Sequence, residues 1–423
     1  MLDIAAALHG WCAQRRDFAV ATVVAVHGSA PRLPGAALAV AADGEALGSV
    51  SGGCVEGAVY ELCRQALDGG HSIVERFGYS DDDAFATGLT CGGAIDVLIT
   101  PVRWGSVRDR RAAGRARVLA AAVAAAADGY PAALARVVAG PPELVGGALL
   151  VRPGRPVTGS VGGPAALDRT VAREAAALLA AGRTTTRTVG AAEAGCGRPV
   201  TVLVESSLPA PRMIVFGAVD FAGALVRAGR FLGYRVTVCD ARPVFATARR
   251  FPEADEVVVD WPHRYLDRQT TAPGTGGPAD PDYGPHLGPA NGREQEGGSA
   301  DGQGSAWARG IDGRTALCVL THDTKFDVPL LVRALRLPVG YVGAMGSRRT
   351  HLARLHRLRE AGLTARELSR LHSPIGLDLG ARTPEETALS IAAEIVAARR
   401  GGSGTPLTGT HTPIHRDLAL PPT

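Results

Sequence analysis

The sequence contains few aromatic residues and no strong excess of charge of either sign. Phe, Trp and Tyr make up 5% of the 423 residues, and the formal net charge is +4. A charge this small and this evenly spread gives no basis for nucleic-acid binding. Because hydrophobic residues make up 46% of the chain, its length predicts two or three globular domains that each bury a core.

The sequence also lacks a targeting segment and a long hydrophobic run. Residues 1–18 do not have a basic start followed by an apolar stretch, so we expect no signal peptide. The Ala-rich run at 118–127 is too short and too weakly apolar to span a bilayer. These features predict a cytoplasmic protein with no membrane partner.

The cysteines form no Cys-x-x-Cys pair, which argues against a structural zinc site. Seven cysteines are scattered along the chain: Cys12, Cys54, Cys63, Cys91, Cys196, Cys239 and Cys318. Their odd number and their spacing do not suggest a disulfide framework. In a reducing cytosol we expect them to be free thiols.

The chemistry-bearing feature of the first half is the glycine-rich stretch 48–57, which contains Gly52, Gly53 and Cys54. The apolar residues that follow recur with helical spacing as far as Leu67, where Asp68-Gly69-Gly70 ends the pattern. Cys54 is therefore expected near a helix N-terminus, where free amides and the helix dipole favour a thiolate and anions. The alternative is a buried, inert cysteine, because free cysteine is among the most buried residue types.

Two further loops share this composition. Thr90-Cys91-Gly92-Gly93 precedes a predicted strand at 95–99, and the loop 27–35, which carries Ser29 and Arg32, follows a predicted strand at 18–26. If the fold brings these loops to the Cys54 loop, they form one pocket with two thiols and many backbone amides. The acidic run at 81–83 between them reads as a solvated turn rather than a metal site.

The second half alternates predicted strands and helices, in the order strand–Gly–helix–strand–Asp, from Met213 to Asp240. That order is typical of a dinucleotide-binding half. The glycine fingerprint is incomplete, because Val219 replaces a glycine that lets a pyrophosphate approach, and Asp220 adds a negative charge. The sequence thus predicts a Rossmann-like parallel sheet that binds NAD or FAD poorly.

Later in the chain, Gly343-Ala344-Met345-Gly346-Ser347-Arg348-Arg349 joins a strand at 339–342 to a basic helix at 350–361. This loop suits a phosphate or oxyanion, although a tight turn followed by a solvated basic face explains it as well. A helix is also expected at 329–335, and a capping box at 383–386 begins the last helix. Residues 270–310 are rich in Gly, Pro, Asp and Ser, which predicts a disordered insertion.

The ordered set of these motifs resembles the XdhC/CoxI family of accessory proteins for molybdenum-containing hydroxylases. The matching segments occur in family order and cover most of the chain: 28–35, 48–56, 91–93, 238–242, 321–323, 343–349 and 374–380. The resemblance implies an α/β protein with a mixed α+β XdhC/CoxI domain at 1–207 and a Rossmann-like parallel-sheet domain at 212–400. The insertion at 270–310 and a flexible tail at 401–423 complete this expected domain organisation.

The resemblance also implies binding of the molybdenum cofactor, help with its sulfuration, and delivery to a xanthine dehydrogenase-type molybdenum hydroxylase. A cysteine desulfurase and a second copy of the chain are further candidate partners. Cys54 and Cys91 would contact the molybdenum or its sulfur, since thiolates suit a soft metal centre. The expected cofactor-binding residues are Ser29, Arg32, Ser51, Gly52, Gly53, Cys54, Glu56, Cys91, Gly92, Gly93, Asp240, His322, Gly346, Ser347 and Arg348.

Two other functions stay open on the sequence alone. The Rossmann half allows a nucleotide-dependent oxidoreductase, which the glycine-poor fingerprint disfavours. A purely structural assembly factor would contact the hydroxylase without touching its cofactor. No nucleophile–base–orienter set of the hydrolase kind is apparent, so we expect a binding and transfer protein rather than an enzyme.

Overall fold

The computed structural model describes residues 1–28, 30–78, 93–104, 110–190, 198–270, 310–321 and 323–408. Packing divides the chain into two compact units, whose described parts meet at Pro209 and Ala210. The acidic run at 81–83 and most of the 270–310 segment lie outside the described residues. None of the described helices is long and apolar enough to cross a membrane.

The first unit contains two five-stranded antiparallel sheets. Sheet one has the strand order β3-β2-β1-β5-β4 and is built from β1 (Phe18–His27), β2 (Ala37–Ala41), β3 (Ala46–Gly48), β4 (Ile73–Gly78) and β5 (Ala94–Val102). Sheet two has the order β8-β7-β6-β10-β9 and is built from β6 (Ala132–Ala139), β7 (Ala148–Val151), β8 (Thr158–Ser160), β9 (Thr185–Val189) and β10 (Val200–Ser207).

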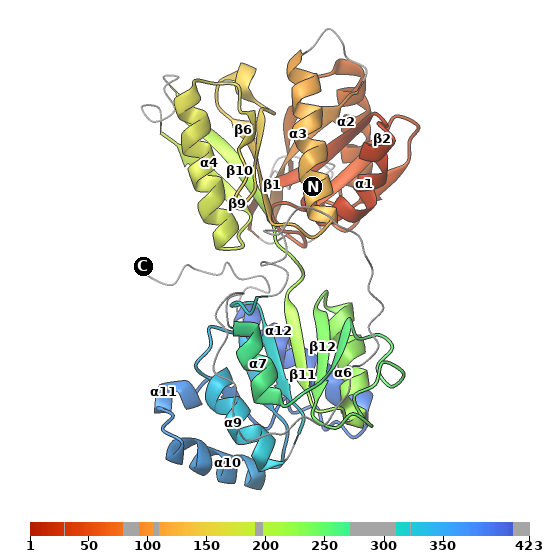
Figure 1. Ribbon diagram of the computed structural model, residues 1–423. Helices are drawn as coiled ribbons and strands as arrows, with labels where there is room; N and C mark the ends of the chain where they lie inside the picture. The colour runs from red at the N-terminus through yellow and green to blue at the C-terminus, as the bar shows by residue number, and fades with distance from the viewer. Residues whose placement is uncertain are drawn as a thin grey trace. The chain divides into compact units, whose positions relative to one another are not determined.

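Helices cover both faces of these sheets (Figure 1). The core between the sheets contains α1 (Ala5–Ala13), which continues the 3-10 turn η1 (Leu2–Ile4), and α3 (Arg110–Ala127). The opposite face of sheet one packs against α2 (Glu56–Gly69), and the outer face of sheet two packs against α4 (Ala165–Ala180). A short 3-10 turn, η2 (Pro142–Leu144), precedes β7. This mixed α+β architecture agrees with the expected fold class.

The second unit is a six-stranded parallel sheet in the order β13-β12-β11-β14-β15-β16. Its strands are β11 (Arg212–Phe216), β12 (Arg235–Asp240), β13 (Glu256–Val259), β14 (Ala316–Val319), β15 (Tyr341–Ala344) and β16 (Leu371–His372). Numbered along the chain this is the order 3-2-1-4-5-6, which is typical of the Rossmann fold. The switch point, where ligands of such sheets bind, lies between β11 and β14.

The helices of the second unit lie on both faces of the sheet (Figure 1). One face is covered by α6 (Asp220–Phe231) and α12 (Pro384–Arg400). The other face is covered by α7 (Pro262–Thr270), α9 (Thr324–Ala334), α10 (Arg348–Glu360) and α11 (Ala365–Leu368). The capping box before α12 is confirmed, because Thr383 Oγ1 accepts from the Glu386 amide at 3.2 Å while Glu386 accepts from the Thr383 amide.

One helix begins earlier than its sequence suggested. Pro329 was expected at the start of a helix, whereas α9 begins at Thr324 and contains Pro329 in its second turn. Asp323 caps the helix by accepting a hydrogen bond from the Lys325 amide at 3.1 Å. A proline this close to the N-terminus costs the helix a single backbone hydrogen bond, so the aspartate cap sets the true start.

Candidate functional site

The Cys54 loop is held in shape by a single carboxylate, that of Glu56. Glu56 is the first residue of α2 and accepts hydrogen bonds from the Ser49 hydroxyl at 2.6 Å, the Ser51 hydroxyl at 2.5 Å, and the amides of Ser51, Gly52 and Gly53 at 2.9, 3.0 and 2.8 Å. The Ser51 hydroxyl oxygen in turn accepts from the Cys54 and Val55 amides. The stretch 49–56 therefore forms a closed hydrogen-bond network, which we call the Glu56 knot.

These contacts keep Glu56 ionised. Partial burial alone would raise the pKa of Glu56, but the hydrogen bonds from the Ser49 and Ser51 hydroxyls and from backbone amides lower it to about 2. The negative charge lies at the N-terminus of α2, where the helix dipole favours it. We expected the N-terminus of α2 to attract an external anion, but the Glu56 carboxylate already occupies it.

The amides of Gly52 and Gly53, which we expected to bind the cofactor, donate to Glu56 in this structure. Both glycines adopt positive φ angles, +83° and +125°, which favour glycine. A Cβ built on either residue would meet nothing within 4 Å. The outer side of this turn is therefore open for a ligand to approach, although its amides point inward.

Cys54 follows the two glycines and lies two residues before α2, as the sequence predicted. Its side chain is half-buried, and it packs at the margin of the core beneath α2. By contrast, Cys63 on the same helix is fully buried, and burial raises the pKa of its thiol to about 12. Cys54 is thus the cysteine of α2 and its leading loop that a ligand can reach.

Sheet one brings the described ends of the three expected loops to the same end of its strands. Strand β1 ends at His27, which pairs with Ala94 at the start of β5, and β3 ends at Gly48, which pairs with Leu38 near the start of β2. Three parts of the chain therefore begin or end at the same end of these strands: the segment after His27, the segment after Gly48, and Gly93. The ends of β3 and β5 are three strand spacings apart, about 14 Å. Cys91, Gly92 and Ser29 lie outside the described residues, so the pairing of the two thiols stays a prediction.

Arg32 lies on the loop that follows β1 and is about half exposed. Its Nη2 donates to Asp3 at 3.2 Å, while its buried Nε has no hydrogen-bond partner among the described residues. Because this Nε is buried, the donors that a ligand can reach are those of the exposed part of the guanidinium. Asp3 neutralises part of its charge, which weakens the attraction that Arg32 exerts on a phosphate.

In the second unit, Asp240 lies at the carboxyl end of β12, where a Rossmann protein binds the ribose of a dinucleotide. Its carboxylate accepts from the Ala218 amide at 2.8 Å, and from the Arg242 amide and guanidinium at 2.8–2.9 Å. Burial alone would raise the pKa of Asp240, but these hydrogen bonds outweigh it and lower the pKa. Asp240 is 2% exposed and already engaged by the protein itself.

The loop from β15 to α10 places Gly346, Ser347 and Arg348 at the start of a helix. Ser347 is the N-cap of α10, and its Oγ accepts from the Thr350 amide at 3.1 Å. Arg348 is exposed, while Arg354 on the same helix is buried. Because an N-cap serine satisfies only part of the free amides of the helix, this loop can still receive an anion. His322, expected to join it, lies outside the described residues.

Sequence reasoning missed several polar residues that shape these loops. Ser49 belongs to the Glu56 knot, and its position within the glycine-rich stretch was the available signal. At the loop edge of sheet one, His27, Asp96 and Arg76 form a cluster: His27 Nε2 lies 3.0 Å from Asp96 Oδ2, and Arg76 Nε donates to Asp96 Oδ1 at 2.6 Å. Only the pairing of β1, β5 and β4 brings this cluster together, so no local pattern reveals it.

Comparison with known proteins places most of the chain in two family models. The model described as the XdhC and CoxI family matches residues 11–78 and 125–190, and the model described as the XdhC Rossmann domain matches residues 213–395. A crystal structure from Bacillus halodurans, described as a xanthine dehydrogenase, shares the fold with a TM-score of 0.60 and 21% sequence identity. That alignment covers 96% of this chain and 98% of the other.

Curated relatives match parts of the chain. They include the uncharacterized protein YqeB of Escherichia coli (strain K12), 23% identical over 60% of this chain and 41% of that protein. The molybdenum cofactor insertion chaperone PaoD of the same strain is 38% identical over 21% of this chain and 28% of its own length. A protein of Bacillus subtilis (strain 168), described as a probable xanthine dehydrogenase component, is 27% identical over 45% of this chain and 44% of its own length. The chain spans less than half the length of these relatives.

The two family models follow one another along the chain and correspond to its two compact units. The relatives and the shared fold agree with both matches. The chain belongs to the XdhC and CoxI family and carries an XdhC Rossmann domain as its second half.

Proposed function

We propose that this protein is a maturation factor that binds the molybdenum cofactor as cargo and delivers it to a xanthine dehydrogenase-type molybdenum hydroxylase. Family membership supports this role, as does the similarity to the insertion chaperone PaoD. Support of cofactor sulfuration, with a cysteine desulfurase as the sulfur donor, is part of the same proposal. The partner hydroxylase is inferred from the xanthine dehydrogenase-related protein of Bacillus subtilis.

The observation that carries the proposal is the half-exposed Cys54 on a loop whose shape is fixed in advance. The Glu56 knot fixes the backbone of 49–56 without any ligand, so the thiol is positioned before cargo arrives. A preorganised loop loses less conformational entropy when it binds. A thiolate is a suitable ligand for a soft, sulfur-rich metal centre.

The same geometry assigns separate roles to the charged residues. Glu56 acts on the loop and not on the cargo, because its carboxylate is surrounded by hydrogen-bond donors of its own segment. The phosphate of the cargo would instead approach past the open outer side of the Gly52–Gly53 turn and meet the exposed part of the Arg32 guanidinium. No group of three or more His, Cys, Asp or Glu side chains in the described residues could hold a metal ion by itself. In this proposal molybdenum is carried with the ligands of its own pterin.

The proposal is tested by measuring bound molybdenum after co-production with a partner hydroxylase. Cys54→Ser keeps the shape of the side chain and removes the soft ligand, so we expect it to lower the molybdenum content about tenfold or more and to lower partner activity. The melting temperature should stay nearly unchanged. Wild-type occupancy in Cys54→Ser would show that the thiol is not a cargo contact, and an unfolded variant would show that Cys54 is structural.

The second candidate function, a nucleotide-dependent oxidoreductase, is favoured by the 3-2-1-4-5-6 strand order. It is disfavoured by Val219 and by the engagement of Asp240 with Arg242. We expect calorimetry to find no binding of NAD, NADP or FAD tighter than about millimolar, since the backbone approach and the ribose contact are both lost. Micromolar binding of any of the three, or flavin absorbance in the purified protein, would favour the oxidoreductase.

A further inference from the structure

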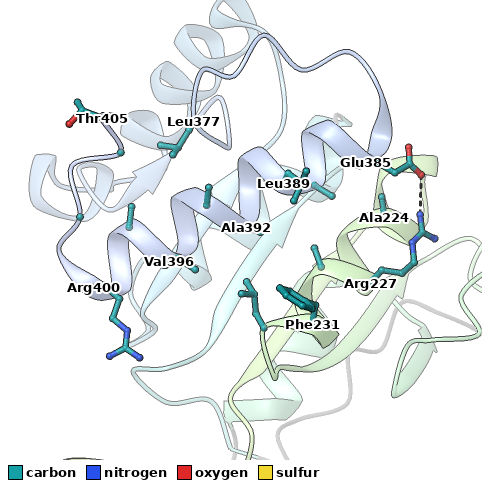
Figure 2. A pocket seen from close by; sticks show the side chains of 17 residues that line it. Ala224, Arg227, Phe231, Leu377, Glu385, Leu389, Ala392, Val396, Arg400 and Thr405 are labelled. Atoms are coloured by element: carbon teal, nitrogen blue, oxygen red, sulfur yellow. Dashed lines mark hydrogen bonds and ion pairs between the residues drawn. The ribbon is translucent and has the colours of Figure 1, made fainter. Parts of the chain in front are cut away.

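An apolar groove of about 770 Å³ runs along α6 and α12 on the outside of the second unit (Figure 2). Phe231 and Leu389 are among the residues that line it, and they are 90% and 63% exposed. Single exposed apolar residues are common on protein surfaces, but a continuous groove of them marks an interaction site. The residues that line the groove indicate what covers it.

The part of the groove formed by α12 has a symmetrical pattern. Its lining positions on that helix are Glu385, Ala388, Leu389, Ala392, Ala393, Val396, Ala397 and Arg400. Reversing the direction of the helix about the midpoint between Ala392 and Ala393 maps this set of positions onto itself. Under that reversal Leu389 meets Val396 and Glu385 meets Arg400, while the alanine positions map onto alanines, of which Ala388 and Ala392 are buried. The face is therefore complementary to a second copy of itself that runs in the opposite direction.

We propose that this face is the interface of a homodimer, in which the α12 helices of two copies pack antiparallel about a two-fold axis near Ala392 and Ala393. A two-fold interface requires the same patch on both copies to be self-complementary. Ala393, which is partly exposed beside the axis, has a small side chain that lets the helices approach closely, and the exposed Phe231 of each copy fills the groove of the other. The inference does not depend on the proposed function, because none of the residues that line the groove belongs to the Cys54 loop or is Asp240.

The charged ends of the groove favour a second copy over an unrelated apolar ligand. Glu385 lies in the first turn of α12 and pairs with Arg227 at 3.0 Å, and Arg400 is the last residue of the helix. In the antiparallel arrangement each Glu385 also faces Arg400 of the other copy, which gives two equivalent ion pairs. Charge pairs at the rim of an interface add little affinity but fix the register and the orientation of the partners.

The first test is the oligomeric state of the full chain by analytical ultracentrifugation over a range of concentrations. We expect a dimer, and we expect Leu389→Arg to weaken it at least 100-fold, because the charge would be buried at the centre of the interface. The matched control is Leu352→Arg on α10, whose side chain is equally exposed, at 66%, outside the groove. That control should remain a dimer with the wild-type dissociation constant.

The second test uses exchanged charges. Glu385→Arg alone sets two arginines against each other across the axis, and Arg400→Glu alone sets two glutamates against each other. Each variant should therefore dimerise about tenfold more weakly than the wild type, because the substitution is present in both copies and removes both ion pairs. Mixed in equal amounts, the two variants should form a heterodimer, in which both pairs are again of opposite charge.

Three outcomes would overturn the proposal: a monomer at all concentrations, a dimer that Leu389→Arg does not dissociate, or charge variants that fail to associate when they are mixed. A fourth outcome concerns the residues after Thr408, which follow the groove-lining Thr405. If removal of residues 409–423 converts a monomeric full chain into a dimer, the groove is occupied by the chain's own tail. A second copy would then be excluded as its occupant in the intact protein.

Discussion

At the scale of single residues, the environments of the cysteines differ more than their sequence contexts suggest. Cys12, Cys63, Cys239 and Cys318 are buried free thiols. Burial raises the pKa of Cys12 to about 11 and the pKa values of Cys63 and Cys318 to about 12. Cys54 is half-buried and lies before a helix N-terminus. Among the described cysteines, chemical reactivity should therefore concentrate on Cys54.

This contrast gives a labelling prediction. In the native protein a maleimide should modify Cys54 well before the four buried cysteines, because only a reachable thiolate reacts. Cys63→Ser should cost about 1–2 kcal/mol of unfolding free energy, since it places a hydroxyl in an apolar core, while Cys54→Ser should cost much less. Mass spectrometry of labelled peptides and urea denaturation measure the two effects. Equal labelling of Cys54 and Cys63 would contradict the burial on which the prediction rests.

Glu56 gives a prediction that depends on pH. Glu56→Gln removes the charge that the loop donors surround, so we expect a loss of about 1–3 kcal/mol at neutral pH, with most of the effect in residues 49–56. The carboxylate has a pKa near 2 in the folded protein, below its ordinary value of 4.5. Its stabilisation is therefore present above pH 4.5 and is lost as the pH falls toward 2.

The measurement compares the unfolding free energy of the wild type and Glu56→Gln between pH 7 and pH 3. The difference should shrink as the pH falls, because the unfolded carboxylate takes up a proton near its ordinary pKa of 4.5 while the folded carboxylate, with a pKa of about 2, stays ionised. Glu61→Gln, further along α2, is the control, since it lies outside the knot. A difference between wild type and Glu56→Gln that stays constant across this range would show that the charge does not hold the loop.

At the scale of secondary-structure elements, long periodic segments were predictable and short edge elements were not. The buried strands β1 and β11 and the helices α2 and α12 follow from apolar runs, helical spacing and caps that the sequence displays directly. The strand β9 and the helix α7 were not predicted. Polar threonines make up most of β9, so this strand depends on tertiary packing. The helix α7 begins at Pro262, and a proline at the first helical position is a start signal that the prediction overlooked.

The candidate site was only partly predictable for a related reason. The glycine-rich stretch and the position of Cys54 before a helix are local features, and the structure bears them out. The partner of the Gly52 and Gly53 amides is not a local feature, because nothing in the spacing shows that the Glu56 side chain folds back over its own loop. The hydrogen bond from the Ala218 amide to Asp240 is likewise visible only when β12 and the turn after β11 are placed together.

The connection between α7 and β14 also belongs to this scale. Residues 271–309 are poor in large aliphatic side chains, and we expect their composition to contribute no core. Replacing them with a short Gly-Ser linker should leave the melting temperature within about 2 °C of the wild type, since loop length has a small effect on stability. Removing 365–368 instead, which contains the buried Leu368 of α11, should lower it strongly. A large loss on deleting 271–309 would show that the segment is structural.

At the scale of the whole molecule, the chain has two separate sets of buried cores. Four clusters of buried apolar residues lie within the first unit, and the other two lie within the second, so each cluster of the described residues draws on one unit alone. The buried ion pairs follow the same division. Arg136 pairs with Glu205 at 2.7 Å in the first unit, and Arg354 pairs with Asp327 at 2.9 Å in the second.

Separate cores predict that the two units unfold in separate steps. Scanning calorimetry should show two transitions, because two-state behaviour is a property of single domains. Arg354→Ala should lower the second unit's transition by the equivalent of about 3–5 kcal/mol, since it removes the cation that pairs with the buried Asp327 carboxylate. Arg349→Ala, an exposed change on the same helix, is the control. Cys63→Ser should move only the first unit's transition, so a single transition that both variants shift together would show that the units are one cooperative structure.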